Sequence, residues 1–583
     1  MRIGNCSGFY GDRLSAMREM LEGGPLDVLT GDYLAELTML ILGRDQLKDP
    51  SLGYAKTFVT QLEDSLGLAL ERGVKIVSNA GGLNPAGLAD RIREVARGLG
   101  LDPAVAYVDG DDVRSLGFRN ALTANAYLGG SGIAAALSAG ADVVVTGRVT
   151  DASLVVGPCV AHFGWDATSY DELAGAVVAG HVLECGCQAT GGNFSGFMGM
   201  HQAAVASPIG FPVAEVAADG SSVITKHAGT GGMVTVDTVT AQLMYEVQGP
   251  QYLGPDVTTD LTSIRLAADG PDRVRISGVR GSAPPERLKV CVNELSGYRN
   301  SVEFVLTGLD VQNKADWVRL QLTPALTASK VTWTTGPSPQ PDAATEEGAS
   351  TLLRCTVRDP SPDPVGRAFS AAAVELALAS YPGFTMTAPP GNGSPVGVYR
   401  GEYADRSAVQ HTVHHADGST QVVADPLVGE GRQGPSRDPG ADVGDAGFGS
   451  GASAPSSTSG HAPSSTTRGR RLPLGTFVHA RSGDKGGDAN LGLWVAHVDE
   501  QRYDARVGWL LATVTPEFIY DLLPEANCLP VLVHPLPNLG GVNVVIHQLL
   551  GEGVAASTRF DPQAKGLGEW ARARHVEIPE ELL

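Results

Sequence analysis

The sequence predicts an α/β protein whose N-terminal domain is built on a mostly parallel sheet. Five stretches in the first 150 residues run from an apolar, β-branched core directly into glycine, aspartate or asparagine, and each is followed by a helix-like segment. Strands that alternate with helices imply βαβ units and a parallel sheet. Right-handed crossovers then place the carboxyl ends of all five strands on one edge of the sheet. The predicted strands lie in the segments that begin at Arg2, Leu26, Lys75, Val105 and Asp142.

Three helices are expected between these strands. The segment Asp12–Glu22 opens with an aspartate that suits an N-cap, and its apolar residues are three and four positions apart. Tyr54–Gly73 has the same spacing and ends on glycine. Asn84–Gly100 starts with an asparagine cap and a proline in the first turn, and it also ends on glycine.

Composition divides the chain into three regions. Residues 1–415 form the predicted N-terminal domain, with an α/β part over 1–221 and a β-rich α+β part over 222–415. Residues 416–471 are rich in Gly, Ser, Pro, Thr and Asp, a composition that predicts a flexible, disordered linker. Residues 472–583 show two helical patterns among short strands, which predicts a ferredoxin-like α+β domain.

Charge and cysteine content exclude several classes of protein. The formal net charge is −21 and the pI is near 5.0, so phosphate backbones and anionic lipids are repelled, and neither nucleic acid nor membrane is an expected partner. Seven cysteines are too few and odd in number for a disulfide framework. No apolar run reaches the roughly 18 residues of a membrane span, and the first residues lack the pattern of a secretory signal. A cytoplasmic protein is the expectation.

The predicted strand ends carry polar residues suited to a ligand site. Ligands of parallel α/β sheets bind beyond the carboxyl ends of the strands. Asp32 and Asp109 follow two of these strands and are candidate bases. The loop after a third strand supplies Asn79, Gly81, Gly82 and Asn84, whose backbone N–H groups at a helix N-terminus suit a carboxylate, a thioester oxygen or a phosphate. A tight turn that merely needs glycine is the alternative.

Arg148 follows the last of these strands, and Asp151 lies three residues later. The guanidinium offers a planar fork for a carboxylate or phosphate. The alternative is an internal Arg148–Asp151 pair that closes the loop. The ligand role is the one predicted, and both residues are assigned to substrate binding.

Two later motifs add candidate catalytic groups. In the segment 180–196, Glu184 is a candidate acid or base, Asn193 an orienting amide, and Cys185 a nucleophile unless it is inert core. His227 precedes a glycine loop and is either a proton shuttle or a surface histidine.

The sequence does not specify a metal site. Several aspartates near the strand ends could hold Mg²⁺ or Mn²⁺ through waters, but the first domain contains no H-x-H, HExxH or Glu-x-x-His cluster. Neither a strict G-x-G-x-x-G nor a Walker loop follows the first strand. The cofactor is therefore unknown.

In the C-terminal region, one loop concentrates polar and glycine residues beside a strand. Arg481 and Lys485 lie in "HARSGDKGGDANLG", and such a loop makes an anion-binding nest with a fixed cation. Both are assigned to substrate binding, with a solvated hairpin as the alternative.

The chain resembles the acyclic terpene utilisation (AtuA) family. The resemblance rests on "GFYGDR", "LTGDYLAE", "SNAGGLNP", "VTGRVTDAS", "LECGCQATGGNFSGF", "TKHAGTGGMVTVDTV", "ARSGDKGGDANLG" and "HPLPNLGGVNVVIHQLLGEG". Gly487 departs from the asparagine expected after "SGDKG". The resemblance implies an AtuA-type domain followed by a ferredoxin-fold domain, and a setting in the catabolism of acyclic terpenes or branched acids as CoA thioesters.

These observations lead to a hypothesis of a catabolic enzyme that acts on a branched-chain or acyclic isoprenoid carboxylate or acyl-CoA by lyase or hydratase-type chemistry. The expected partner is thus a small molecule, and a homo-oligomer is expected. One alternative is a non-catalytic acyl-binding or assembly subunit. A metal-dependent hydrolase is the other.

Overall fold

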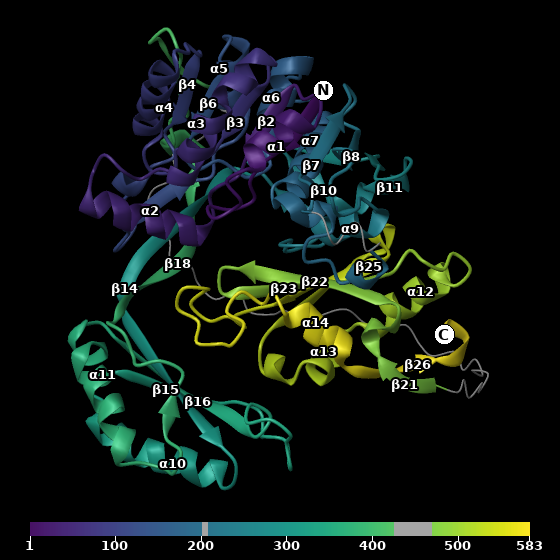
Figure 1. Ribbon diagram of the computed structural model, residues 1–583. Coiled ribbons are helices and arrows are strands. Elements are labelled where there is room, and N and C mark those ends of the chain that lie inside the picture. Colours follow the sequence, from purple (N-terminus) through teal and green to yellow (C-terminus); the bar gives the residue numbers. More distant parts are fainter. Residues whose placement is uncertain (201–207, 425–468) are drawn as a thin grey trace, which may run out of the picture.

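The structure, a computed structural model, describes residues 1–200, 208–424 and 469–583. Its largest sheet has eleven strands in the order β11-β12-β8-β7-β1-β2-β3-β6-β4-β19-β20 (Figure 1). The five central strands are mutually parallel, and they are the five predicted ones. They are β1 (Arg2–Asn5), β2 (Val28–Gly31), β3 (Lys75–Ser78), β6 (Val143–Thr146) and β4 (Val105–Asp109).

Antiparallel strands extend this parallel core on both sides, so the sheet is mixed. Later parts of the chain supply these strands, which need no helical crossover because they run antiparallel. On one side lie β7 (Pro212–Val216), β8 (Ser222–Lys226), β12 (Val274–Ser277) and β11 (Arg265–Ala268), and on the other β19 (Thr412–His414) and β20 (Thr420–Val422).

Helices cover the parallel core as the sequence predicts. The three expected helices are α1 (Ala16–Gly23), α3 (Lys56–Glu71) and α4 (Pro85–Leu99). Helix α1 begins four residues after Asp12, because the Asp12 carboxylate accepts the Gly8 N–H at 3.0 Å instead of capping the helix. Two further helices, α2 (Glu36–Lys48) and α5 (Ser131–Ser138), were not predicted.

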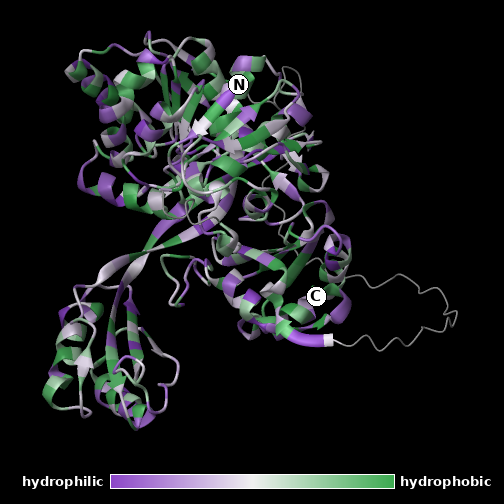
Figure 2. Ribbon diagram, turned by 45° about the vertical axis from the view of Figure 1, so that its right-hand side comes forward, coloured by the Kyte–Doolittle hydropathy of each residue, from purple (hydrophilic) through white to green (hydrophobic). Residues whose placement is uncertain are grey.

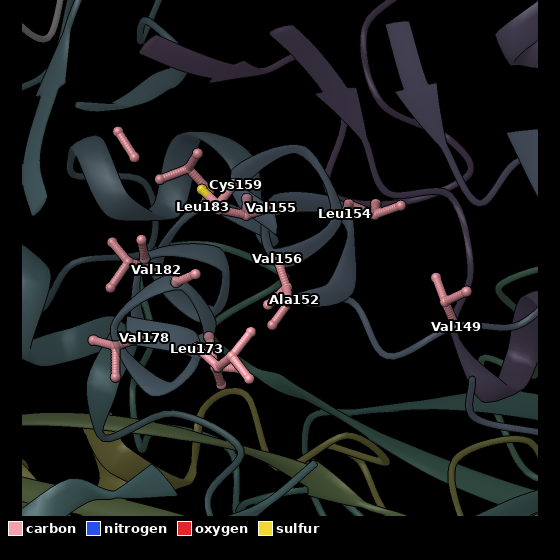
Figure 3. Packing of buried hydrophobic residues seen from close by; sticks show 14 of the residues in the cluster. Val149, Ala152, Leu154, Val155, Val156, Cys159, Leu173, Val178, Val182 and Leu183 are labelled. Carbon is pink, nitrogen blue, oxygen red and sulfur yellow. The ribbon is translucent and has the colours of Figure 1, made fainter. Parts of the chain in front are cut away.

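Helices α6 (Ser153–Phe163) and α7 (Tyr170–Leu183) form a largely buried layer beside the sheet. Every residue of α7 from Leu173 to Leu183 is buried. Figure 3 shows their side chains packed together, with Val149 and Leu183 among the labelled residues. Because Val149 follows Arg148 and Leu183 precedes Glu184, this packing fixes the loops that carry two of the predicted site residues.

A long strand carries part of the β-rich segment 222–415 away from the main sheet. β14 (Arg287–Thr307) pairs along its first half with β18 (Ser394–Asp405) and β5 (Thr123–Ala126). Its second half pairs with β16 (Ser350–Asp359) in a separate lobe, residues 298–394, which we call the arm lobe (Figures 1 and 2). This lobe has its own hydrophobic core and contains β15 (Lys330–Thr335), β17 (Thr385–Met386), α10 (Val311–Leu322) and α11 (Arg367–Val374).

The C-terminal domain is α+β, with an antiparallel sheet in the order β22-β23-β25-β24. These strands are β22 (Val478–Lys485), β23 (Asp488–Val495), β25 (Gly541–Ile546) and β24 (Val531–Leu536), accompanied by α12 (Tyr503–Thr513), α13 (Pro516–Leu522) and α14 (Leu567–Ala573). A two-stranded ribbon of β21 (Gly469–Pro473) and β26 (His575–Pro579) adjoins them. Most of the predicted linker, residues 425–468, lies outside the described residues.

Three short strands and one helix complete the body. β9 (Gln251–Leu253), β10 (Thr258–Asp260) and β13 (Arg280–Ser282) form a small antiparallel sheet. Helix α9 (Val236–Leu243) lies between the main sheet and the C-terminal domain (Figure 1). Among the described residues, no helix is both long enough and apolar enough to cross a bilayer.

Candidate functional site

The loops after β1, β2 and β6 open into a cavity of about 830 Å³. This volume is in the roughly 300–1,000 Å³ range of small-molecule sites. Residues of both domains line the cavity, which is why we call it the central cavity. The N-terminal domain supplies Asp32, Arg148, Asp151, Glu184 and Asn193, and the C-terminal domain supplies Asp484, Lys485, Gln563 and Lys565.

Asp32 is fixed at the end of β2 by the residue that ends the neighbouring strand. The Asn79 amide, directly after β3, donates to the Asp32 carboxylate at 2.6 Å. The Asn79 carbonyl oxygen in turn accepts the backbone N–H of Tyr33 at 2.8 Å. Asn79 is fully buried and does not line the cavity, so it orients Asp32.

Arg148 lies in the loop after β6 and is only 2% exposed. Its Nη1 donates to the Leu34 carbonyl at 2.8 Å and pairs with Asp151 at 3.0 Å. Its guanidinium lies 4.4 Å from the centre of the Tyr127 ring, while its Nε is buried without a partner. The internal pair with Asp151 is therefore present, and it leaves part of the guanidinium facing the cavity.

The carboxyl groups around Arg148 hold protons more tightly than ordinary aspartates. Burial and the neighbouring Asp151 raise the pKa of Asp32 well above its usual value, although Arg148 opposes this. Burial raises the pKa of Asp151 to about 6, with Arg148 opposing and Glu184 adding to the rise. Burial therefore favours the protonated form of both carboxyl groups, which lie beside one cation.

Glu184 directly follows α7 and brings a carboxylate to the cavity. Its Oε1 lies 3.0 Å from Nδ1 of His181 on the same helix, and its Oε2 is buried without a partner. Although burial opposes it, Glu184 raises the pKa of His181. The next residue, Cys185, also lines the cavity, but burial raises the pKa of its thiol, which disfavours a thiolate nucleophile.

The C-terminal domain adds two ammonium groups to the lining of the cavity. Lys485, the last residue of β22, lies 3.6 Å from the Glu246 carboxylate, and Lys565 lies 3.6 Å from both Glu246 and Asp484. Burial acts against the charge of Lys485, but Glu246, Tyr252, Glu36 and Glu184 together outweigh it. They raise the pKa of Lys485, which keeps the lysine protonated. Burial raises the pKa of Asp484 to about 6.

Contacts between the domains hold these lysines at the cavity. The fully buried Trp494 donates from Nε1 to Asp237 on α9 at 3.1 Å, and His497 Nδ1 lies 2.7 Å from the same carboxylate. Arg481 donates to the Asn193 carbonyl at 2.8 Å and also bonds the Gln188 side chain. Arg481 does not line the cavity, so it positions the loop that contains Asn193.

Several lining residues were not predicted. Glu36 and Tyr127 come from the two unpredicted regions around α2 and β5, and Lys289 comes from β14. Glu246 and Tyr252 follow α9. Glu36 ends the motif "LTGDYLAE" but was not assigned a role. No local motif marks the other four, because each reaches the cavity only through the packing of distant segments.

The strand ends do not all open into this cavity, which corrects the expected convergence. Asp109, Gly82 and Asn84 line a second cavity of about 560 Å³. Asp109 pairs with His414 at 3.1 Å, because β19 adds to the sheet beside β4. Asn84 caps α4 by accepting the Gly87 N–H at 2.9 Å. A Cβ on Gly81 would lie 2.5 Å from the Thr146 carbonyl oxygen, so glycine is needed there for close backbone approach.

His227 lies away from both cavities, which corrects its expected place beside the other candidates. It is 4% exposed, its Nε2 is 3.0 Å from the Met20 carbonyl, and its ring fills the space beside Gly23 and Gly24. Burial lowers its pKa. The ring has a packing role at the end of α1.

The aspartates considered for a metal are spread over separate sites. Asp32 lines the central cavity, whereas Asp109, Asp111 and Asp112 line the second one. Asp111 is buried and accepts the backbone N–H of Arg148 at 2.8 Å. Over the described ranges, no group of three or more His, Cys, Asp or Glu side chains is arranged to hold a metal ion.

Comparison with protein families identifies both domains. Residues 1–415 match the model of the acyclic terpene utilisation family protein AtuA, and residues 472–577 match that of the AtuA ferredoxin-like domain. Neither a curated protein nor a solved structure matches the chain.

Proposed function

This chain belongs to the AtuA family of acyclic terpene utilisation, and on that premise we propose that it is an enzyme acting on a branched-chain or acyclic isoprenoid carboxylate or its acyl-CoA. The observation that carries the proposal is the composition of the central cavity wall. It combines a buried guanidinium, two aspartates with raised pKa values and a glutamate with a free oxygen. These groups can donate, accept and stabilise charge in acid–base chemistry next to a carbonyl group.

In the proposed reaction, Arg148 and Lys485 bind the carboxylate or thioester oxygen. Glu184 removes a proton from the adjacent carbon through Oε2, and the negative charge that develops on the oxygen is stabilised by Arg148. For a 3-hydroxyacyl substrate, the C–O bond then breaks and the hydroxide leaves as water with the proton of Asp32. Glu184 ends protonated and Asp32 ionised, and proton return resets the site. Hydration of the alkene is the reverse sequence.

The size of the cavity supports an acyl group as the ligand. The wall includes Leu34, Tyr127, Tyr252 and Leu253, which offer apolar surface to a branched chain beside the charged groups of the cavity. Apolar surface combined with polar groups that fix the orientation of a ligand is typical of small-molecule sites.

Deuterium exchange tests the proton-abstraction step on its own, even where the later steps of the reaction are not observed. The full-length protein is incubated in D₂O with branched-chain and isoprenoid carboxylates and acyl-CoAs, and label at the carbon next to the carbonyl is measured by mass spectrometry. We expect exchange by the wild type and a loss of about 10²- to 10⁴-fold in Glu184→Gln, the range for removal of a general base.

Glu172→Gln is the matched control, because Glu172 lies in α7, the helix that Glu184 follows, and outside the cavity. It should exchange like the wild type. For ligand binding, Lys485→Met should weaken the affinity measured by calorimetry, and the exposed Lys330→Met should not. Exchange by no substrate of this class, or equal exchange by Glu184→Gln, would contradict the proposal.

A further inference from the structure

A further charged cavity, of about 490 Å³, lies between the arm lobe and the C-terminal domain. We call it the arginine pocket, because three arginines line it. Arg299 lies on β14, Arg354 lies on β16, and Arg559 lies in the C-terminal domain. The proposed reaction uses none of them.

Strand register adds a fourth arginine beside this lining. Arg299 pairs with Arg358 across the β14–β16 ladder, Ser301 pairs with Thr356, and Glu303 pairs with Arg354. Residues two apart on a strand point to the same face, so this row forms one wall of the pocket and continues to Arg358. Like charges opposite each other in a sheet are unfavourable. An arginine pair at this position therefore needs a compensating negative charge.

The protein supplies only part of that charge. Carboxylates pair with three of the four arginines, namely Glu303 with Arg354 at 2.5 Å, Glu552 with Arg358 at 2.7 Å and Glu525 with Arg559 at 2.5 Å. Glu552 and Glu525 are more than half exposed, so water screens their pairs.

Arg299 has no carboxylate partner among the described residues. Its Nη1 reaches the Ser557 carbonyl at 3.3 Å, and burial together with Arg358 and Arg354 lowers its pKa. Arg559 leaves its Nε buried with no partner. Two guanidinium groups on facing walls thus keep unused donors.

Hydroxyl groups complete the wall between these arginines. Ser301 and Thr356 stand on the arm-lobe side, and Ser557 and Thr558 on the side of the C-terminal domain. Guanidinium forks and hydroxyl donors around a partly enclosed space match the several acceptor oxygens of a phosphate group.

From this arrangement, we propose that the arginine pocket is a binding site for a phosphate-bearing ligand. The phosphate satisfies Arg299 and Arg559 together and joins the arm lobe to the C-terminal domain. The site stands on its own residues and does not depend on the reaction assigned to the central cavity.

The position of the pocket allows two sources of this phosphate. Pro562 lines the arginine pocket and the next residue, Gln563, lines the central cavity, so the two spaces lie on either side of one loop. The phosphate is either the distal part of a ligand whose acyl end occupies the central cavity, or part of a separate molecule.

Calorimetric titration with sodium pyrophosphate at constant ionic strength tests the site in the full-length protein. We expect saturable binding by the wild type and a loss of about 10- to 100-fold in Arg299→Met and in Arg559→Met, as for a removed charge-assisted hydrogen bond. The two variants alter opposite walls, so a folding defect in one leaves the other informative. Arg319→Met on α10 removes a charge from the same lobe outside the pocket and should bind like the wild type.

Thermal unfolding gives a second readout. Pyrophosphate should raise the Tm of the wild type and of Arg319→Met but not of Arg299→Met. If Arg299 had a merely structural role, Arg299→Met would have a lower Tm than the wild type, but pyrophosphate would still raise that Tm as much as it raises the Tm of the wild type. That result would overturn the proposal. Absence of pyrophosphate binding by the wild type, or unchanged binding by both pocket variants, would overturn it too.

Competition identifies the source of the phosphate. If an acyl-CoA bound in the central cavity supplies it, saturating acyl-CoA displaces pyrophosphate from the wild type. If the phosphate belongs to a separate ligand, both bind together. Both results support the phosphate site. The competition experiment can still be interpreted if the chemistry proposed for the central cavity is wrong, because coenzyme A alone can replace the acyl-CoA as the competitor.

Discussion

Replacing Asp237 by alanine should weaken the docking of the C-terminal domain, which completes the central cavity. Asp237 is 8% exposed, and its carboxylate accepts three hydrogen bonds across the domain interface. They come from Nε1 of Trp494 at 3.1 Å, from the His497 backbone N–H at 3.1 Å and from His497 Nδ1 at 2.7 Å. The Tyr503 hydroxyl, 2.7 Å from Nε2 of His497, extends this chain to the surface.

The magnitude follows from what each donor loses. Trp494 is fully buried, so its unpaired N–H costs about 1–3 kcal/mol. Each hydrogen bond to a charged acceptor contributes about 1.5–3 kcal/mol, but His497 is partly exposed and recovers part of this from water. We therefore expect Asp237→Ala to lower the free energy of unfolding by about 3 kcal/mol.

Urea unfolding followed by circular dichroism measures this change as a shift of the transition that reports on the C-terminal domain. A double-mutant cycle with Trp494→Phe isolates the tryptophan bond, because phenylalanine removes the donor and keeps most of the ring. In that background Asp237→Ala should cost about 1–2 kcal/mol less than it costs alone. A loss below about 0.5 kcal/mol in the single variant, or strict additivity in the cycle, would refute the reasoning.

Three further predictions concern the same region and the site. Asp484→Asn should be more stable than the wild type at pH 8 by about 3 kcal/mol. Burial raises the pKa of Asp484 to about 6. The wild type therefore loses this stability as the pH rises from about 4 to about 6. Chemical denaturation at pH 4 and pH 8 measures the difference in stability between the two proteins, and an equal difference at the two pH values would contradict the prediction. Gly492→Ala should destabilise the docking of the C-terminal domain on the N-terminal domain by about 1–3 kcal/mol, because the added Cβ would lie 2.7 Å from Cβ of Met244. As the control, Gly508→Ala in α12 adds a Cβ that meets nothing within 4 Å and should not lower the Tm. Asp32→Asn should fold and still slow turnover of a substrate identified by exchange about 10²- to 10⁴-fold, measured by rapid-quench kinetics; unchanged turnover would remove Asp32 from the proton-transfer step.

The sequence predicted those parts of the fold that local patterns specify. The five parallel strands and the helices α3 and α4 match the apolar runs and caps closely, because the Asn84 cap and the left-handed Gly100 are local devices. It did not predict α2, whose apolar residues have little helical periodicity, nor the split role of β14, whose two halves pair in different lobes.

The residues of the candidate site also fall into those that local patterns identify and those that depend on tertiary packing. Asp32, Arg148, Asp151 and Glu184 could be found from the sequence, because each follows closely after a strand or a helix whose buried pattern is readable. Lys485 could be found as a loop cation. Its approach to the remaining groups depends on the docking of one domain on the other, a contact between residues that are hundreds of positions apart.

By itself, the sequence determined which residues stand at the ends of the parallel strands, since period and capping are properties of neighbouring residues. Only the tertiary structure decided that Asp109 and Asn84 open into a different cavity from Asp32, and that His227 is enclosed by α1. The physical reason is that antiparallel additions such as β19, and the packing of whole domains, follow from long-range burial of apolar surface, which no local pattern encodes.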